Sequence, residues 1–270
     1  AIGSLIHAED TETISVGGGT EGNIMALWRA REKSGNRKVL LPKSAHFSFE
    51  KACSLLDMNP EYLPLTDEFK PDLNILEEKL DDETAAVVGI AGTTELGVID
   101  PIERIAELSK DVHFHVDAAF GGMVIPFMEK EMPSFDFRIQ GVDTLSVDPH
   151  KMGMSPVPLG LFYSRSNGKV SIESPYLSGE RQKSLRGTRA SASIPAFWAT
   201  MHLLGEKGYR ELVSECMENT RYLVGRMEEK DFEPIIEPTM NIASFACWKT
   251  VSNFFRDAAR PSAASSDPIP

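Results

Sequence analysis

Short apolar runs alternate along most of the chain with stretches of helical periodicity. Apolar or β-branched runs predict strands at 13–16, 37–42, 61–65, 85–91, 113–117, 144–147 and 159–163. Apolar positions spaced three or four apart predict helices at 24–34, 49–57, 71–80 and 101–110. The run at 85–91 is almost continuously apolar, which is typical of a strand covered on both faces of its sheet. This alternation predicts an α/β fold with a doubly wound, mainly parallel sheet.

The pattern changes in the last third of the chain. Residues 175–189 are predicted to form a long loop, and two helices are predicted at 193–206 and 209–229. The second helix is long and charged on one face, as expected of a helix that bridges to a smaller domain. An apolar run at 242–247 predicts the first strand of that domain.

These elements predict a large domain followed by the beginning of a small one. The large domain covers 1–205, and the start of a small C-terminal α+β domain covers 206–250. Residues 251–270 are rich in Ala, Ser and Pro, a composition typical of a disordered or aberrant tail. Residues 1–8 have the pattern of the end of a helix, so we expect a fragment that lacks parts at both ends.

Composition narrows the class of protein. The 270 residues contain 41% hydrophobic and 25% charged residues, which is ordinary for a globular chain. The net charge of -12 leaves no basic stripe to neutralise phosphates, which argues against a nucleic-acid partner. No run approaches ~20 apolar residues, so no membrane span is predicted. Cys53, Cys216 and Cys247 are far apart without metal-ligand spacing, which predicts free thiols in a reducing, cytoplasmic compartment and no metal site.

A glycine-rich turn joins the first predicted strand to the helix that follows it. Backbone N–H groups at such a turn and the positive end of the helix dipole bind phosphate. Gly18 and Gly19 let the backbone approach a ligand closely, and Thr20 adds a hydroxyl donor. The turn lacks the Gly-Lys-Ser/Thr of a Walker loop, and it is not a dinucleotide fingerprint. A connector without a ligand is the alternative.

Polar side chains follow four other predicted strands. They are His46, Thr93, Asp117, and the adjacent pair His150 and Lys151. The carboxyl ends of parallel strands share one edge of the sheet, where ligands bind. A lysine that is desolvated there has more free amine, which imine formation with an aldehyde requires. A surface lysine in a turn and a structural histidine are the alternatives.

Taken together, these groups match the needs of pyridoxal 5'-phosphate (PLP). Its phosphate needs anion donors, and its flat ring needs a stacking partner such as His46. Its pyridine nitrogen needs a carboxylate such as Asp117, and its aldehyde needs an amine such as that of Lys151. The sequence therefore predicts a PLP site at the carboxyl edge of the sheet.

Seven motifs carry a resemblance to a known family. They are Gly18-Gly19-Thr20-Glu21-Gly22-Asn23, Ala45-His46-Phe47-Ser48, Gly92-Thr93-Thr94-Glu95-Leu96-Gly97, His115-Val116-Asp117-Ala118-Ala119, Asp148-Pro149-His150-Lys151, Pro175-Tyr176-Leu177 and Gly187-Thr188-Arg189. Through these motifs the chain resembles the group II PLP-dependent amino-acid decarboxylases, and most closely the archaeal L-tyrosine/L-aspartate decarboxylases. The resemblance covers residues 14–248. The resemblance implies an aspartate aminotransferase-like fold of type I, whose large domain has a mainly parallel seven-stranded sheet, and a homodimer.

The resemblance also implies roles for single residues. Lys151 is expected to form the internal aldimine, Asp117 to pair with the pyridine nitrogen and His46 to stack on the ring. The cofactor-binding residues that it implies are Gly18, Gly19, Thr20, His46, Thr93, Asp117, Ala119, His150, Lys151 and Thr188.

Three residues of the predicted loop receive further roles. Tyr176 is the candidate proton donor to the substrate Cα, with a packing tyrosine as the alternative. Arg189 is the candidate for binding the substrate carboxylate as a bidentate fork, with a structural ion pair as the alternative. Thr188 is expected to reach the phosphate bound by the partner subunit.

The implied activity is decarboxylation of an L-amino acid, from L-tyrosine to tyramine or from L-aspartate to β-alanine. Alternatives are a glutamate decarboxylase, a carbon–carbon lyase similar to sphingosine-phosphate lyase, and a truncated inactive paralogue. A cysteine desulfurase is disfavoured because Cys53, Cys216 and Cys247 fall in helix or strand patterns.

Overall fold

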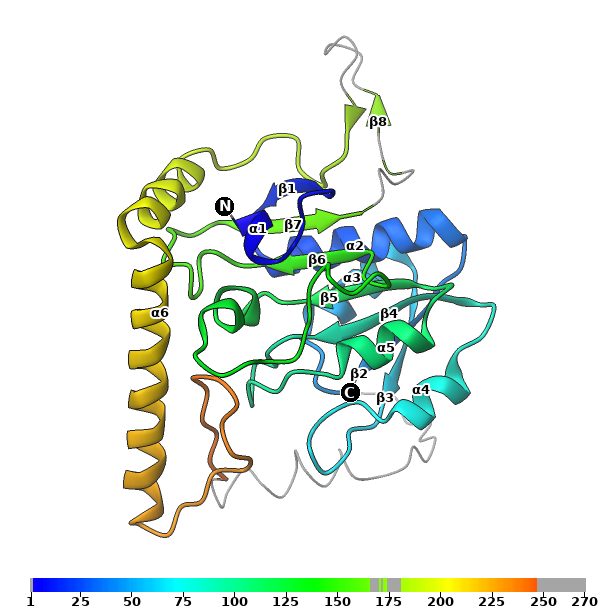
Figure 1. Ribbon diagram of the computed structural model, residues 1–270. Coiled ribbons are helices and arrows are strands. Elements are labelled where there is room, and N and C mark those ends of the chain that lie inside the picture. Colours follow the sequence, from blue (N-terminus) through cyan, green and yellow to red (C-terminus); the bar gives the residue numbers. More distant parts are fainter. Residues whose placement is uncertain (1, 166–169, 171, 174–180, 247–270) are drawn as a thin grey trace, which may run out of the picture.

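The computed structural model describes residues 2–165, 170, 172–173 and 181–246, and its centre is a seven-stranded sheet (Figure 1). The strands of this sheet are β1 (Glu12–Val16), β2 (Lys38–Pro42), β3 (Asn59–Leu63), β4 (Thr84–Ile90), β5 (His113–Asp117), β6 (Thr144–Val147) and β7 (Gly160–Ser164). Their order is β1-β7-β6-β5-β4-β2-β3. Strand β7 runs antiparallel to both of its neighbours, while the other adjacent pairs are parallel. The mainly parallel, seven-stranded sheet is confirmed.

Helices cover both faces of the sheet. They are α1 (Ile2–Leu5), α2 (Gly19–Ser34), α3 (Ser48–Leu56), α4 (Leu73–Lys79), α5 (Ile102–Leu108) and α6 (Ser193–Glu228), with 3-10 turns η1 (Gly121–Met123) and η2 (Ile125–Phe127). Helices α2 and α3 pack on one face, and α4 and α5 pack on the other (Figure 1). Every residue of β4 is buried as a result, which explains its unbroken apolar run.

Local sequence explains where helices begin and end. Helix α4 begins after Asp72, whose Oδ1 accepts hydrogen bonds from the backbone N–H groups of Asn74 and Ile75 at 2.9 and 3.4 Å. Helix α2 ends at Gly35, which has a left-handed φ of 78° and donates its N–H to Arg31 O at 2.7 Å. These two caps satisfy backbone groups that a helix end would otherwise leave unpaired.

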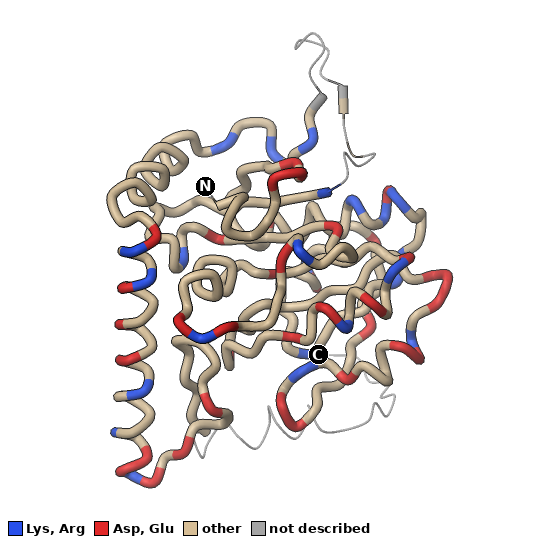
Figure 2. Tube along the Cα trace, viewed as in Figure 1, with Lys and Arg blue, Asp and Glu red and all other residues tan. Residues whose placement is uncertain are grey.

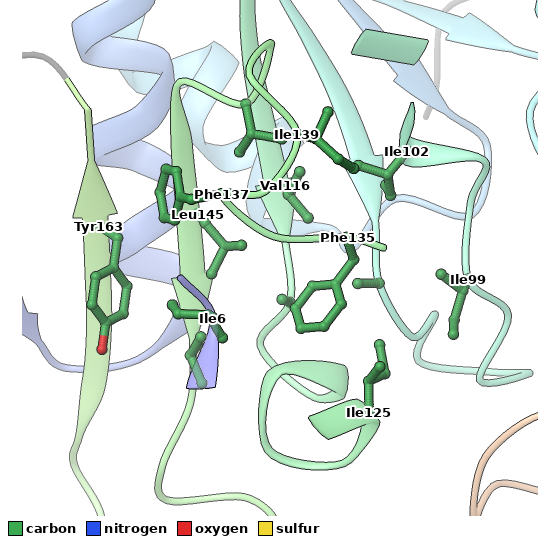
Figure 3. Close-up of a cluster of buried hydrophobic side chains, with 14 of the residues drawn as sticks. Ile6, Ile99, Ile102, Val116, Ile125, Phe135, Phe137, Ile139, Leu145 and Tyr163 are labelled. Carbon is green, nitrogen blue, oxygen red and sulfur yellow. The ribbon is translucent and has the colours of Figure 1, made fainter. Parts of the chain in front are cut away.

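The largest hydrophobic core lies on the face of the sheet that carries α4 and α5. Figure 3 shows Ile6, which follows α1, Val116 of β5, Leu145 of β6 and Phe135, from the segment between η2 and β6, pointing into this cluster. All four side chains are at most 1% exposed. Ile2 of α1 belongs to the same cluster, so the N-terminal segment is part of the core although it lies far in sequence from the strands that it contacts.

The C-terminal third departs from expectation in three places. The two predicted helices are joined as α6, which is interrupted at Gly205 by a φ of 60° and a ψ of -173°. Part of the predicted loop pairs instead as a short hairpin of β8 (Ile172–Glu173) and β9 (Arg181–Gln182). The described part of the predicted strand at 242–247 forms only a bridge from Phe245 to Pro234, next to a hydrogen bond from the N–H of Ile235 to Ser244 O at 2.8 Å.

Residues 234–246 pack back on the large sheet. Met240 is fully buried, and its side chain lies beside Gly92 at the end of β4. Ile242 contacts Gly97 in the same turn, and Ser244 Oγ donates to Glu95 O. The division into a large and a small domain stays a prediction, and the predicted tail at 251–270 lies outside the described residues.

Charged residues of both signs are interspersed over the structure. Along α6, Lys and Arg alternate with Asp and Glu (Figure 2), and pairs such as Arg210 with Glu206 lie one helical turn apart. Within the described part of the chain, no helix combines the length and the apolar content that crossing a membrane requires.

The buried carboxyl of Asp100 is expected to make the stability of the fold depend on pH. It is 1% exposed; its Oδ2 accepts the N–H of Ile90 at 2.8 Å, and its Oδ1 has no partner among the described residues. Burial raises the pKa of this carboxyl from 3.8 to about 7, against the opposing effect of the Ile90 hydrogen bond. The folded state thus holds a proton that the unfolded state releases between pH 4 and 7. The free energy of unfolding should fall as pH rises through this window, by about 1.4 kcal/mol per pH unit.

Urea denaturation of wild type and Asp100→Asn at pH 4, 5.5, 7 and 8 checks this expectation. The variant should lack this contribution to the slope and gain stability relative to wild type as pH rises. Asp67→Asn, at an exposed position, is the matched control and should keep the wild-type slope. Parallel curves for wild type and Asp100→Asn would show that Asp100 carries no such proton.

Candidate active site

A cavity of about 630 Å³ opens at the edge where the parallel strands end. Residues that follow β1, β2, β4, β5 and β6 line it. The structure brings eight of the predicted site residues together around this cavity, namely Gly18, Gly19, Thr20, His46, Asp117, Ala119, His150 and Lys151. The shared edge explains why residues so distant in sequence meet here.

The glycine turn before α2 forms one wall of the cavity. Gly18 has a φ of 151°, and a Cβ added there would lie 2.9 Å from His150 Cε1. Both the backbone conformation and the close approach of the imidazole therefore require glycine. In the first turn of α2, the N–H groups of Glu21 and Gly22 donate to Gly18 O at 3.0 and 3.2 Å and that of Gly19 faces Asp148, while the N–H of Thr20 has no acceptor within the helix. This wall is suited to binding an anion.

His150 presents a hydrogen-bond donor beside the same turn. Its Nδ1 accepts the backbone N–H of Leu159 at 3.1 Å, so the neutral ring carries its proton on Nε2. That Nε2 lies 3.6 Å from Asp148 Oδ2. The imidazole thus adds a side-chain donor to the backbone donors of the glycine turn.

Lys151 is paired with a buried acid, Asp148, which was not predicted from the sequence as a site residue. Its Nζ lies 3.3 Å from Asp148 Oδ2, and the Lys151 side chain is 41% exposed while that of Asp148 is 3% exposed. Burial raises the pKa of Asp148, against the opposing effects of Lys151, the N–H of Gly19 and His150. The pair holds the amine at the cavity wall while leaving it accessible.

Asp117 lies at the end of β5 with both oxygens engaged. Its Oδ1 accepts the N–H of Ala119 at 3.0 Å, and its Oδ2 accepts Asn23 Nδ2 at 2.8 Å. The side chain is mostly buried, and Asp117 lines the cavity. Two donors therefore fix the carboxylate in one orientation.

His46 is oriented by the start of α3. Its Nδ1 accepts the backbone N–H of Ser48 at 3.2 Å and lies 2.8 Å from Ser48 Oγ. The proton of the neutral ring is therefore on Nε2. Burial lowers the pKa of His46, which the nearby Asp117 partly offsets. Phe47 packs beside this ring, with ring centroids 4.1 Å apart.

Other predicted site residues do not line the cavity. Thr93 is 2% exposed, and its Oγ1 accepts the N–H of Val98 at 3.0 Å, while its neighbour Thr94 faces the cavity. Thr188 and Arg189 are exposed and lie outside it. Tyr176 lies outside the described residues. The predicted roles of these four residues stay predictions.

Four residues at the site were missed as functional candidates. Asn23 and Asp148 belong to motifs that the sequence interpretation used, but no local pattern indicates that their side chains contact Asp117 and Lys151. Glu21 accepts the N–H of Gly17 at 2.7 Å and pairs with Arg186 at 2.6 Å across the turn. This long-range pair left no signal in the sequence.

Comparison with known proteins identifies the family. Residues 13–248 match the pyridoxal-dependent decarboxylase conserved domain. A protein from Methanothermobacter thermautotrophicus, named probable L-tyrosine/L-aspartate decarboxylase, is 42% identical over 90% of this chain and 70% of its own length. A protein from Archaeoglobus fulgidus, named probable L-aspartate decarboxylase, is 43% identical over 90% of this chain and 68% of its own length. The chain belongs to the pyridoxal-dependent decarboxylase family.

Solved structures show the same fold. The sphingosine-1-phosphate lyase of Burkholderia pseudomallei superposes with a TM-score of 0.82 at 26% identity, over 95% of this chain and 65% of the lyase. Glutamate decarboxylase of Lactobacillus brevis superposes with a TM-score of 0.77 at 23% identity, over 87% of this chain and 60% of that structure. These likenesses confirm the type I fold of PLP-dependent enzymes.

The residues present fit the family's cofactor. Three cavity-lining side chains carry a buried polar atom without a partner among the described residues, namely Glu21 Oε1, Ser44 Oγ and Asp148 Oδ1. Buried polar atoms are rarely left unpaired in a native protein, so their presence indicates a polar ligand. An anion-binding turn, a carboxylate, an imidazole and an amine around one cavity match the chemical groups of PLP.

Proposed function

We propose that this chain carries the PLP-binding and catalytic part of an amino-acid decarboxylase acting on L-tyrosine or L-aspartate. The observation that carries the proposal is the convergence of Lys151, Asp117, His46 and the turn at Gly18 around one cavity. The names of the two relatives support these substrates. Because the chain spans about two thirds of its relatives' lengths, the activity of the whole protein is part of the proposal.

Each residue has a proposed task toward the cofactor. Gly18, Gly19 and Thr20 bind the phosphate with N–H and hydroxyl donors, and His150 adds its Nε2–H. When bound, PLP supplies an aldehyde that captures the substrate amine and a ring that accepts the electron pair left by carbon dioxide. Among the remaining predicted cofactor residues, Ala119 lines the cavity, whereas Thr93 supports the adjacent turn.

Three side chains act around the reacting atoms in this proposal. Lys151 supplies the amine that binds the aldehyde, and its accessible Nζ permits this. Asp117 binds the proton-bearing pyridine nitrogen, so that the ring can accept electrons. His46 covers the face of the ring and helps exclude water from it. Tyr176 stays our candidate for returning a proton to Cα.

The substrate carboxylate needs a cation in this scheme. Arg186 lines the cavity but is paired with Glu21, whereas Arg189 in the same loop has no ion pair among the described residues. We therefore keep Arg189 as the candidate for the substrate carboxylate.

A homodimer in the cytoplasm is the proposed assembly and location. Trp198 and Leu203, near the start of α6, are 62% and 85% exposed, and a second copy would cover such apolar side chains. Thr188 is exposed in the segment just before α6, as a residue that reaches a partner's phosphate must be. Cys53 and Cys216 are free thiols, in agreement with a reducing compartment.

Product analysis tests the proposed reaction. Protein reconstituted with PLP is incubated with L-tyrosine, L-aspartate or L-glutamate, and carbon dioxide and amine are measured. We expect tyramine or β-alanine in equal amounts with carbon dioxide. Exclusive formation of 4-aminobutyrate would indicate glutamate as the substrate. Cofactor-loaded protein that releases no carbon dioxide from any of the three would contradict the proposal.

A further inference from the structure

A chain of buried hydrogen bonds runs from Asp117 into the interior of the sheet. Asn23 Nδ2 contacts Asp117 Oδ2 at 2.8 Å, and Asn23 Oδ1 lies 3.0 Å from His115 Nε2. His115 Nδ1 lies 3.0 Å from Thr144 Oγ1, which is also 3.0 Å from His113 Nε2. Asn23, which contacts the carboxylate, and the three residues beyond it in the chain are at most 4% exposed. Water therefore does not complete their hydrogen bonding, and each contact needs one donor and one acceptor.

The chemistry of Asn23 determines the direction of the chain. A carboxylate only accepts hydrogen bonds, so the amide nitrogen of Asn23 must face Asp117 and its oxygen must face His115. His115 then carries its proton on Nε2. Burial, together with the nearby His113, lowers the pKa of His115 to about 3, against the opposing effect of a contact with the Thr144 backbone. The ring is therefore neutral, and with its proton on Nε2 its Nδ1 accepts.

The direction continues through the next two residues. Because His115 Nδ1 accepts, the hydroxyl of Thr144 donates to it, and the same oxygen accepts from His113 Nε2. Burial lowers the pKa of His113 as well, against the opposing effect of Asp143. All donors in the chain thus point towards Asp117.

A branch joins the same asparagine to His46. The second N–H of Asn23 donates to Ser48 Oγ at 3.0 Å. The Ser48 hydroxyl is then free to donate to His46 Nδ1, 2.8 Å away. Ser48 is fully buried, so no solvent competes for this hydroxyl. One amide therefore contacts Asp117 directly and His46 through a single hydroxyl.

Without Asn23, the same side chains could also hydrogen-bond to one another in the opposite direction. If His115 carried its proton on Nδ1, it would donate to Thr144, and Thr144 would donate to His113. His113 would then hold its proton on Nδ1, which lies 3.9 Å from Asp143 Oδ2. In that arrangement His115 Nε2 would face the oxygen of Asn23 without a proton between them. The Asn23 amide excludes this opposite direction, because its oxygen faces His115 and needs a donor there.

We propose that Asn23 is a positioning residue that directs this buried chain towards Asp117 and, through Ser48, aligns His46 in the same site. Directed donors polarise one another, so the chain stabilises the negative charge of the Asp117 carboxylate, where the cofactor's ring nitrogen would bind. The inference rests on the proposed function for the tasks of Asp117 and His46. The direction of the chain itself does not depend on a cofactor.

Nitrogen NMR of the wild-type protein without added cofactor tests the direction first. With 15N-histidine labelling, long-range 1H–15N spectra report which ring nitrogen carries the proton, and His115→Gln and His113→Gln assign the signals. We expect both neutral rings to carry the proton on Nε2. A proton on Nδ1 of His115 would overturn the proposal without the need for any variant at Asn23.

Asn23→Ala tests the positioning role. We expect it to populate the Nδ1-protonated form of His115 and to raise the Kd for PLP about tenfold, the effect of one lost hydrogen bond to a charged group. Ser109→Ala, which removes a buried hydrogen bond at the C-terminal end of α5, in another part of the fold, should change neither. Thr144→Val should leave the proton of His115 on Nε2, because Asn23 still accepts it.

The outcomes separate this inference from the proposed function. If wild type fails to bind PLP, the proposed function fails, and the ring protons alone decide whether Asn23 directs the chain. If wild type binds PLP and folded Asn23→Ala keeps its Kd within twofold, the positioning role is overturned. If Asn23→Ala does not fold, the result with Thr144→Val decides, since loss of the Nε2 proton there would assign the direction to Thr144.

Discussion

Lys151→Ala is expected to lower the decarboxylation rate by more than about 1,000-fold, because it removes the nucleophile that binds the cofactor aldehyde. The structure supports this size of effect, since Lys151 is the lysine that lines the cavity formed by the described residues. No other described side chain there presents a primary amine. Single-turnover kinetics with the favoured substrate and absorbance spectra before and after borohydride measure the loss.

Borohydride should attach the cofactor covalently to wild type and not to the variant, and peptide mass mapping should place the label on Lys151. Lys183→Ala is the matched control, because Lys183 pairs with Glu12 at 2.7 Å and does not line the cavity. It should keep the label and the rate. Removal of Lys151 also leaves Asp148 without its ion-pair partner, so thermal melts of both variants show whether the fold persists. An equally labelled, active Lys151→Ala protein would rule out the assignment.

Asp117→Asn is expected to lower kcat by about 100-fold or more, with a smaller change in KM. The carboxylate receives hydrogen bonds from Asn23 and from the N–H of Ala119, and an amide at this position would turn one of its N–H groups against one of those donors. It would also remove the negative charge that favours a protonated ring nitrogen. Steady-state decarboxylation kinetics across pH 5 to 9 would show the loss.

Asp111→Asn, at an exposed position before β5, is the matched control for this substitution. It should retain wild-type kcat and KM. A change in KM alone for Asp117→Asn would place the residue in substrate binding and not in ring electronics. Unchanged kinetics would remove Asp117 from the site.

Much of the fold can be predicted from the sequence, because burial on both faces of the sheet leaves a strong apolar pattern. The apolar run at 85–91 coincides with β4 almost residue for residue, whereas α2 begins at Gly19, within the glycine turn and five residues before the predicted helix at 24–34. The apolar pattern was a weaker guide where tertiary contacts determine the bounds of an element. The strand predicted at 61–65 lies two residues earlier as β3, since register with β2 sets its position.

The site divides in the same way. Four strand ends, marked by Gly18, His46, Asp117 and the pair His150 and Lys151, were predicted from residue type and position, and the structure gathers them around one cavity. The shared edge of a parallel sheet makes that gathering a consequence of topology. The positions of predicted site residues on loops could not be derived in this way, because a loop has no periodicity from which its position relative to the sheet follows.

The family, the fold class and the side chains that meet the chemical needs of PLP could all be predicted from the sequence. The contacts that hold those side chains came from the structure: Asp148 lies beside Lys151, Asn23 lies between Asp117 and His115, and Arg186 pairs with Glu21 across the glycine turn. The physical reason is that a motif records which chemical groups occur together along the chain. A hydrogen bond between residues 94 positions apart, such as that of Asn23 with Asp117, depends on packing between helix and sheet and leaves no periodic trace in either segment.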